Sequence, residues 1–150
     1  MINFKFQLIN EVNTGLIFEF AVPDQNNSVN NSTSKYLTED AFGFIEGIIN
    51  KHIITYKHYG HWAETVLNKK EWLLIRPELL ALQYKIDKAQ NISEVENELF
   101  NFNFIQEECL DKVTNGFVRY KPNLSKMITD FISWIDMNIE THGSVRIIGI

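Results

Sequence analysis

A long amphipathic helix followed by a short strand is predicted by residues 122–150, PNLSKMITDFISWIDMNIETHGSVRIIGI. Between residues 122 and 140 the large apolar side chains recur at intervals of three and four, the spacing of one helix face; they are Leu124, Met127, Ile128, Phe131, Ile132, Ile135 and Ile139. Thr141-His142-Gly143 favours a helix end, and residues 144–150 are rich in strand formers. We therefore expect the helix to pack on a sheet that contains the strand.

The N-terminal residues predict two further strands. Residues 2–9 alternate between apolar and polar side chains, and residues 16–22 are strand formers that follow the turn sequence Asn13-Thr14-Gly15. Together they predict a hairpin, with residues 144–150 as its third strand. The expected fold is α+β: a small antiparallel sheet, made of the N-terminal hairpin and the C-terminal strand, packed against four to six helices.

The middle of the chain is expected to be mostly helical. Residues 24–35 are almost all polar, so we expect a flexible loop there. Thr38 is placed to cap a helix whose first turn carries Glu39 and Asp40. The buried face of this helix is expected to hold Ala41, Phe44, Ile45, Ile48 and Ile49.

Residues 60–76 fit two interpretations, a helix broken near Lys69-Lys70 or a helix followed by a short strand. We favour the helix. Pro77 suits the first position of the next helix, because its missing N–H would have no partner there anyway. The apolar face of that next helix is expected to comprise Leu79, Leu80, Leu82 and Ile86.

Two more helices are predicted before residue 122. Ser93 and Glu96 have the spacing of a capping box, which indicates a helix start. Residues 100–104 alternate strictly between apolar and polar, yet they lie between helical segments, and their type stays open. Residues 105–114 predict a helix that Asn115-Gly116 ends; its apolar face is expected to hold Ile105, Cys109 and Val113.

Length and composition predict a single domain over residues 1–150, since 150 residues of which 45% are hydrophobic suffice for one core. No signal-peptide pattern is visible, and no apolar run is long enough to cross a membrane. A single cysteine cannot form an internal disulfide. We therefore expect a cytoplasmic protein without a membrane partner.

The charge of the chain is concentrated in one stretch. The net charge is −5, and residues 91–111 alone contribute −6 without a single base. A negative chain argues against a nucleic-acid partner, whereas clustered carboxylates attract a basic protein. A solvated helix face is the alternative interpretation. The six acids are Glu94, Glu96, Glu98, Glu107, Glu108 and Asp111.

These acids are not equal candidates for a partner-binding surface. Glu94 and Glu96 also serve the start of the helix predicted at Ser93. Glu107, Glu108 and Asp111 come later in the run and have no such local role, so we expect them to contact the partner first, with Glu98 and Glu94 beside them.

A second group of chemically active side chains lies in residues 51–64, where three of the four histidines and several aromatics gather. His58, His61 and Glu64 recur at three residues, a spacing that could bind zinc or iron on a helix. Gly60 interrupts such a helix, so we expect no metal and no other cofactor. Tyr59 and Trp62 are more naturally interface residues, because aromatic side chains supply rigid contact area.

Catalysis is not predicted. Cys109 shares an apolar helix face with Ile105 and Val113, where a thiol is usually a small buried hydrophobe. No nucleophile elbow, phosphate-binding loop or dinucleotide-binding glycine pattern occurs in the chain. We expect no catalytic residues.

The acidic run from Glu94 to Asp111, the α+β arrangement across the whole chain and the missing catalytic set together resemble the immunity proteins that neutralise bacterial toxins delivered between cells. This resemblance implies a one-to-one complex with a cognate basic toxin domain, for example a nuclease, whose active site is covered. Two alternatives remain open: a non-catalytic adaptor or homodimer, and a small-ligand or metal-dependent enzyme that uses His58, His61 and Glu64.

Overall fold

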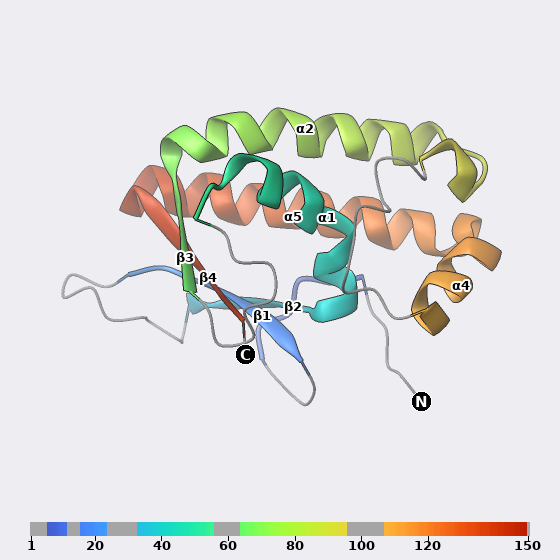
Figure 1. Cartoon of the computed structure of the whole chain (residues 1–150), viewed down its shortest axis with the longest axis horizontal. Helices are drawn as coiled ribbons and strands as arrows, with labels where there is room; N and C mark the ends of the chain where they lie inside the picture. Colours follow the sequence, from blue (N-terminus) through green and yellow to red (C-terminus); the bar gives the residue numbers. More distant parts are fainter. Residues whose placement is uncertain (1–5, 12–15, 24–32, 56–63, 96–106, 150) are drawn as a thin grey trace.

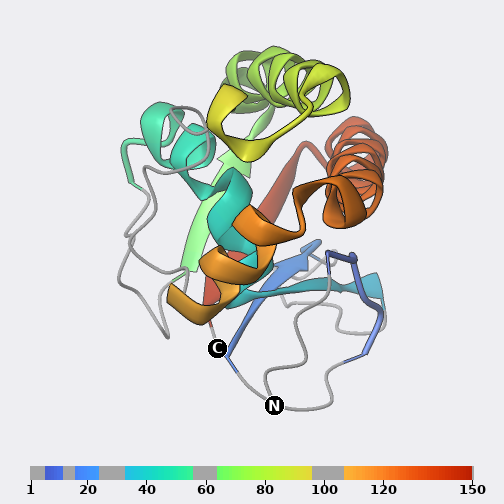
Figure 2. The ribbon, with the colours of Figure 1, turned by 90° about the vertical axis from the view of Figure 1, so that its right-hand side faces the viewer.

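The computed structural model describes residues 6–11, 16–23, 33–55, 64–95 and 107–149 of the 150-residue chain. It confirms the α+β class, with a four-stranded antiparallel sheet in the order β2-β1-β4-β3. Along the chain the elements are β1 (Ile17–Ala21), β2 (Lys35–Thr38), α1 (Glu39–His52), β3 (Glu64–Asn68), α2 (Lys69–Lys88), the short 3-10 helix η2 (Ile92–Glu94), α4 (Glu107–Asn115), α5 (Phe117–His142) and β4 (Ser144–Gly149). Helices α1, α2 and α5 lie on one side of the sheet (Figures 1 and 2).

The predicted N-terminal hairpin is wrong. Strand β1 pairs with β2 on one edge and with β4 on the other, so neither edge is left for the preceding residues. In the described residues 6–11, Ile9 forms a two-bond backbone bridge with Tyr36 of β2, with both N–H···O distances at 2.9 Å, and Asn10 accepts a hydrogen bond from the Lys35 ammonium. β2, which occupies the place expected for the first strand, begins at Lys35, inside the predicted loop. The rest of that loop, residues 24–32, lies outside the described residues.

The helix favoured for residues 60–76 is also wrong in its first part, because residues 64–68 form β3. Thr65 and Leu67 are buried, while their neighbours are exposed, and the strand pairs with β4 along its length. Helix α2 follows at once. Its start is fixed by Asn68, which accepts the Glu71 N–H at 2.9 Å while the Glu71 carboxylate accepts the Asn68 N–H at 3.2 Å.

Three other predicted helix starts are displaced. Pro77 lies inside α2, which begins at Lys69 after the Asn68 cap, and Pro122 lies inside α5, which begins at Phe117 without a side-chain cap. Ser93 is not a cap: the capping box joins Asn91 and Glu94 around η2, two residues before the predicted one. Residues 100–104 lie outside the described part of the chain.

One core joins the sheet to the helices. Thr38 caps α1 as predicted, and its Oγ1 accepts the Ala41 N–H at 3.3 Å. The aromatic centre of the core is Phe20 of β1, whose ring lies 4.9 Å from Phe131 of α5 in an edge-on arrangement and 5.7 Å from Phe42 of α1. All three rings are fully buried. The long C-terminal helix and the strand after it, both predicted, therefore close the core from opposite sides.

Gly143 forms the tight turn between α5 and β4. Its φ of +80° is in the left-handed region, and its N–H bonds the Ile139 carbonyl at 2.8 Å. A Cβ added here would meet no atom within 4 Å, so only the backbone conformation opposes a side chain. We expect Gly143→Ala to lower the free energy of unfolding by about 1 kcal/mol, measured by urea titration. Gly143→Asn, which tolerates this conformation better, should cost less; equal losses would contradict the argument.

No helix in the described part of the chain is long and apolar enough to cross a membrane.

Candidate functional site

The acidic run is divided between two elements. Glu107, Glu108 and Asp111 lie on α4, and Glu94 lies in η2. Glu96 and Glu98 fall outside the described residues. The four described carboxylates are exposed, but they differ in what each already binds.

The Glu94 carboxylate binds backbone N–H groups at the start of its own helix turn, η2. Its Oε2 accepts the N–H of Asn91 at 3.0 Å and that of Gln90 at 2.6 Å. These backbone hydrogen bonds hold the pKa of Glu94 below its ordinary value, because they favour the charged form. Glu94 therefore has a structural role that accounts for its presence.

Glu108 is paired within α4. Its carboxylate contacts the Lys112 ammonium at 2.8 Å, one helix turn later. The hydrogen bond from Lys112 lowers the pKa of Glu108, and the same bond raises the pKa of Lys112. Glu107 and Glu108 also form the first turn of α4, where an acid interacts favourably with the helix dipole. The expectation that these residues lack a local role is wrong for Glu108 and only partly correct for Glu107.

Among the described acids of the run, Glu107 and Asp111 remain unneutralised. They are four residues apart on α4, so they share one helix face, and both are exposed. Within the part of the chain that the structure describes, neither has an ion-pair partner. Like charges at this spacing repel each other, and a cation placed between them would relieve the repulsion.

The histidine and aromatic group of residues 51–64 lies mostly outside the described residues. His58, Tyr59, His61 and Trp62 are among those not described. Glu64 is described, and its carboxylate contacts Arg146 of the adjacent strand at 2.8 Å. His52, earlier in the same group, contacts Glu78 of α2 at 2.6 Å, as does Lys51. Among the residues described, no three histidines, cysteines and acids gather closely enough to bind a metal.

Cys109 lies in the core side of α4, as predicted. The residue is 1% exposed, and burial raises the pKa of its thiol to about 12, with a further contribution from the negative charge of Asp40. A thiol in this state is not a nucleophile at neutral pH.

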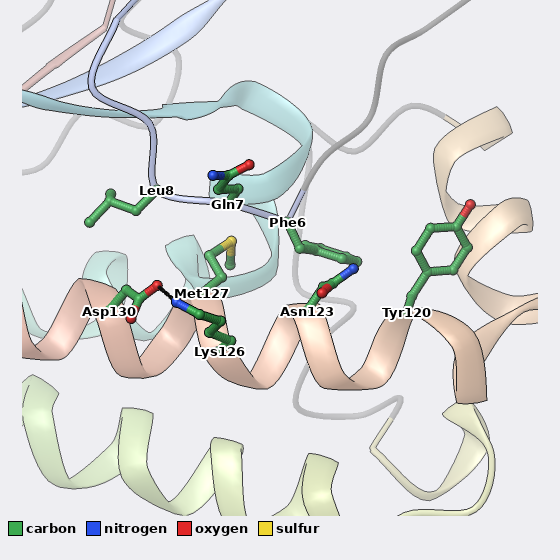
Figure 3. A pocket seen from close by; sticks show the side chains of 8 residues that line it. All are labelled: Phe6, Gln7, Leu8, Tyr120, Asn123, Lys126, Met127 and Asp130. Atoms are coloured by element: carbon green, nitrogen blue, oxygen red, sulfur yellow. Dashed lines mark hydrogen bonds and ion pairs between the residues drawn. The ribbon is translucent and has the colours of Figure 1, made fainter.

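A groove along α5 was not predicted. Two adjoining cavities, of about 430 and 360 Å³, share Leu8 and Asp130 and follow α5 beside the N-terminal segment. Figure 3 shows the larger one, with Phe6, Leu8 and Met127 as apolar lining and an ion pair of 2.5 Å between Lys126 and Asp130. The two cavities are lined by Phe6, Gln7, Leu8, Lys35, Tyr120, Asn123, Lys126, Met127, Asp130, Ser133, Trp134 and Met137.

The groove lies next to the acidic helix. α4 ends at Asn115 and α5 begins at Phe117, so the groove end at Tyr120 is close to α4 in sequence and in space (Figure 3). The larger cavity is mainly polar at its surface, because Phe6 and Met127 are almost fully buried. The smaller cavity is the more apolar one, and its lining includes Leu8, Trp134 and the exposed Met137. The spacing of the α5 residues is visible in the sequence, but the opposite wall depends on where residues 6–8 lie.

Comparison of the chain with protein-family models, with curated proteins and with solved structures gives no match. The candidate site is therefore defined by its own geometry. It consists of the exposed carboxylates of Glu107 and Asp111, which we call the α4 acidic face, and the adjoining groove along α5.

Proposed function

We propose that the chain is a binding protein of the immunity type, which neutralises a basic toxin domain by direct contact through the α4 acidic face. The observation that carries this proposal is the pair Glu107 and Asp111: both carboxylates are exposed on one helix face, and neither is neutralised within the described residues.

Electrostatics supports a cationic partner for this face. An unrelieved carboxylate pair costs folding stability, whereas it accelerates association with an oppositely charged protein. Glu108 is less suited to this role, because Lys112 already neutralises it. We therefore assign the steering charge to Glu107 and Asp111 rather than to the whole acidic run.

The groove would supply the apolar part of the same interface. A partner that contacts α4 can place side chains beyond Tyr120 into the groove, whose more apolar part is lined by Leu8, Trp134 and Met137. Protein interfaces combine such a buried apolar centre with a charged rim. In this arrangement the toxin is held by the groove and attracted by α4.

Charge reversal at the acidic face tests the proposal. We expect Glu107→Lys with Asp111→Lys to slow association with a cognate basic toxin domain by about tenfold or more at low salt. The difference should shrink as NaCl rises, because screening weakens steering. Stopped-flow association rates over a salt series, with toxin-challenged growth of co-expressing cells, measure both effects.

Asp87→Lys with Glu140→Lys is the matched control, since both residues are exposed and the net charge changes equally. Circular dichroism checks that α4 still forms in the reversed variant, and Glu107→Gln with Asp111→Asn removes the charge without opposing the helix dipole. Equal association rates for the acidic-face variant and the control would refute the electrostatic role of α4. Failure of the wild-type chain to bind or protect would refute the immunity function.

A further inference from the structure

The outward side of α2 carries an apolar stripe. Leu73, Leu80 and Tyr84 lie within one narrow sector of the helix and are 63%, 40% and 65% exposed, and Leu74 at 52% widens the stripe. Pro77 lies between them and is exposed as well. The opposite side of α2 is the core side, so the helix is apolar on two faces; the core side holds Trp72, Ile75, Leu79, Leu82 and Ile86. Leu80 was expected on that buried side, and this prediction is wrong.

A stripe of this kind needs an explanation. Single exposed leucines are ordinary on protein surfaces, but a contiguous apolar row usually marks a binding surface. α2 runs along the outer edge of the molecule in both views (Figures 1 and 2). Neither cavity along α5 is lined by an α2 residue, so the stripe is a convex ridge separate from the groove.

Positive charge flanks the stripe at both ends. Lys69 and Lys70 precede it, Lys85 and Lys88 follow it, and all four are exposed. The Lys88 ammonium lies 5.6 Å from the centre of the Tyr84 ring. Three acids of α2 offset this charge in part. Glu71 closes the helix cap and Glu78 is paired with Lys51 and His52, but Asp87 is exposed between the last two lysines. Lys69 already contacts Glu140 at 3.5 Å, so Lys70 and Lys88 carry the electrostatic part of the argument.

We propose that this face of α2 binds an anionic lipid surface. Leucines and a tyrosine on a ridge flanked by lysines are typical of a helix that lies in a membrane interface, with the apolar side chains among the acyl chains and the ammonium groups at the phosphates. That no helix among the described residues could cross a membrane does not bear on a helix that lies along its surface.

Charge separates this surface from the proposed toxin-binding face. A basic toxin domain fits the lysine-flanked ridge poorly, since like charges would meet. α4 lies well away from α2 in both views (Figures 1 and 2), so a membrane that contacts the outward side of α2 would not lie against α4. Both faces could be occupied at the same time.

Vesicle co-sedimentation tests the proposal. We expect the chain to bind vesicles that contain roughly 30–50% phosphatidylglycerol. It should bind pure phosphatidylcholine vesicles far less, because the lysines require anionic headgroups. Lys70→Glu with Lys88→Glu should lower the partition coefficient by about tenfold or more. Leu73→Ser with Leu80→Ser should do the same, since both leucines are exposed and the core is untouched.

The controls repeat these changes elsewhere on the surface. Arg119→Glu with Lys126→Glu matches the change in net charge, and Val118→Ser with Met137→Ser matches the loss of exposed apolar side chains on α5. Both controls should bind vesicles like the wild type. No binding by the wild type, or equal losses in the α2 and α5 variants, would overturn the proposal. A concentration-dependent dimer that Leu73→Ser with Leu80→Ser dissociates in light scattering would assign the ridge to a second copy of the chain instead.

Discussion

Phe131→Ala should lower the free energy of unfolding by about 3–5 kcal/mol, enough to remove much of the stability of an ordinary domain. Phe131 is fully buried at the centre of α5, where its ring meets Phe20 at 4.9 Å and Trp72 at 6.3 Å. Truncation would leave a cavity that joins the sheet side of the core to the α2 side. Urea titration followed by circular dichroism measures the loss.

Val118→Ala is the control on the same helix, because Val118 is 68% exposed. Its free energy of unfolding should stay within about 0.5 kcal/mol of the wild type. Phe131→Leu should fall between the two, since leucine refills part of the cavity. Similar values for Phe131→Ala and Val118→Ala would show that Phe131 is not in the core.

Asp136→Ala should cost about 2 kcal/mol of stability, because two donors from α2 lose one shared acceptor. Asp136 Oδ1 accepts the Trp72 Nε1–H at 2.7 Å, and the carboxylate accepts the Arg76 Nε–H at 2.9 and 3.0 Å. Trp72 is 3% exposed, so in the folded Asp136→Ala variant its indole N–H loses its hydrogen-bond acceptor and has little access to water. The loss is measured by urea titration.

Asp130→Ala separates this effect from simple removal of a carboxylate. Asp130 contacts Lys126 at 2.5 Å on the same helix, and an exposed pair at this spacing contributes about 0.5 kcal/mol or less. In a double-mutant cycle, Trp72→Phe should absorb part of the Asp136→Ala loss, because the shared hydrogen bond is then already absent. Additive losses would mean that Asp136 and Trp72 do not interact.

The correctly predicted parts of the fold are those whose apolar residues repeat at a regular local spacing. Apolar spacing alone identifies α5, because its seven core side chains recur over nearly five turns, and it identifies β4 by its strand formers. β3 was missed because only Thr65 and Leu67 are buried in it, too short a pattern to exclude a helix. Its identity depends on pairing with β4, almost eighty residues away, which no local pattern records.

The predicted hairpin partner of β1 was wrong for the same physical reason, whereas β4 does join the sheet beside β1 as expected. A hairpin between neighbouring segments closes a short loop and is the natural expectation. Here β1 lies between β2 and β4, which pair with its two edges, and this central place in the sheet buries Phe18 and Phe20 more fully than a hairpin at the sheet edge would. Tertiary packing therefore outweighs the local turn signal at Asn13-Thr14-Gly15.

For the candidate site, composition located the acids but not their roles. Whether Glu107 begins a helix, or Glu108 finds Lys112, depends on where α4 starts. The groove along α5 and the ridge on α2 depend on which helix faces the core leaves uncovered. Leu80 illustrates this limit: α2 is apolar on two sides, and α5 and α1 cover the sector of Leu79 and Leu82 while Leu80 stays 40% exposed.

The central pairing of the sheet has a consequence for how the molecule is made. β1 and β4 are hydrogen-bonded neighbours, with Phe20 opposite Ile147, although well over a hundred residues separate them. During synthesis β1 leaves the ribosome long before β4 is made. The edge of β1 that will pair with β4, and the phenylalanines of β1, are therefore exposed to aggregation while the helices assemble. Nascent chains stopped after α5 should therefore be the species that chaperones recognise, and release of β4 should end that dependence.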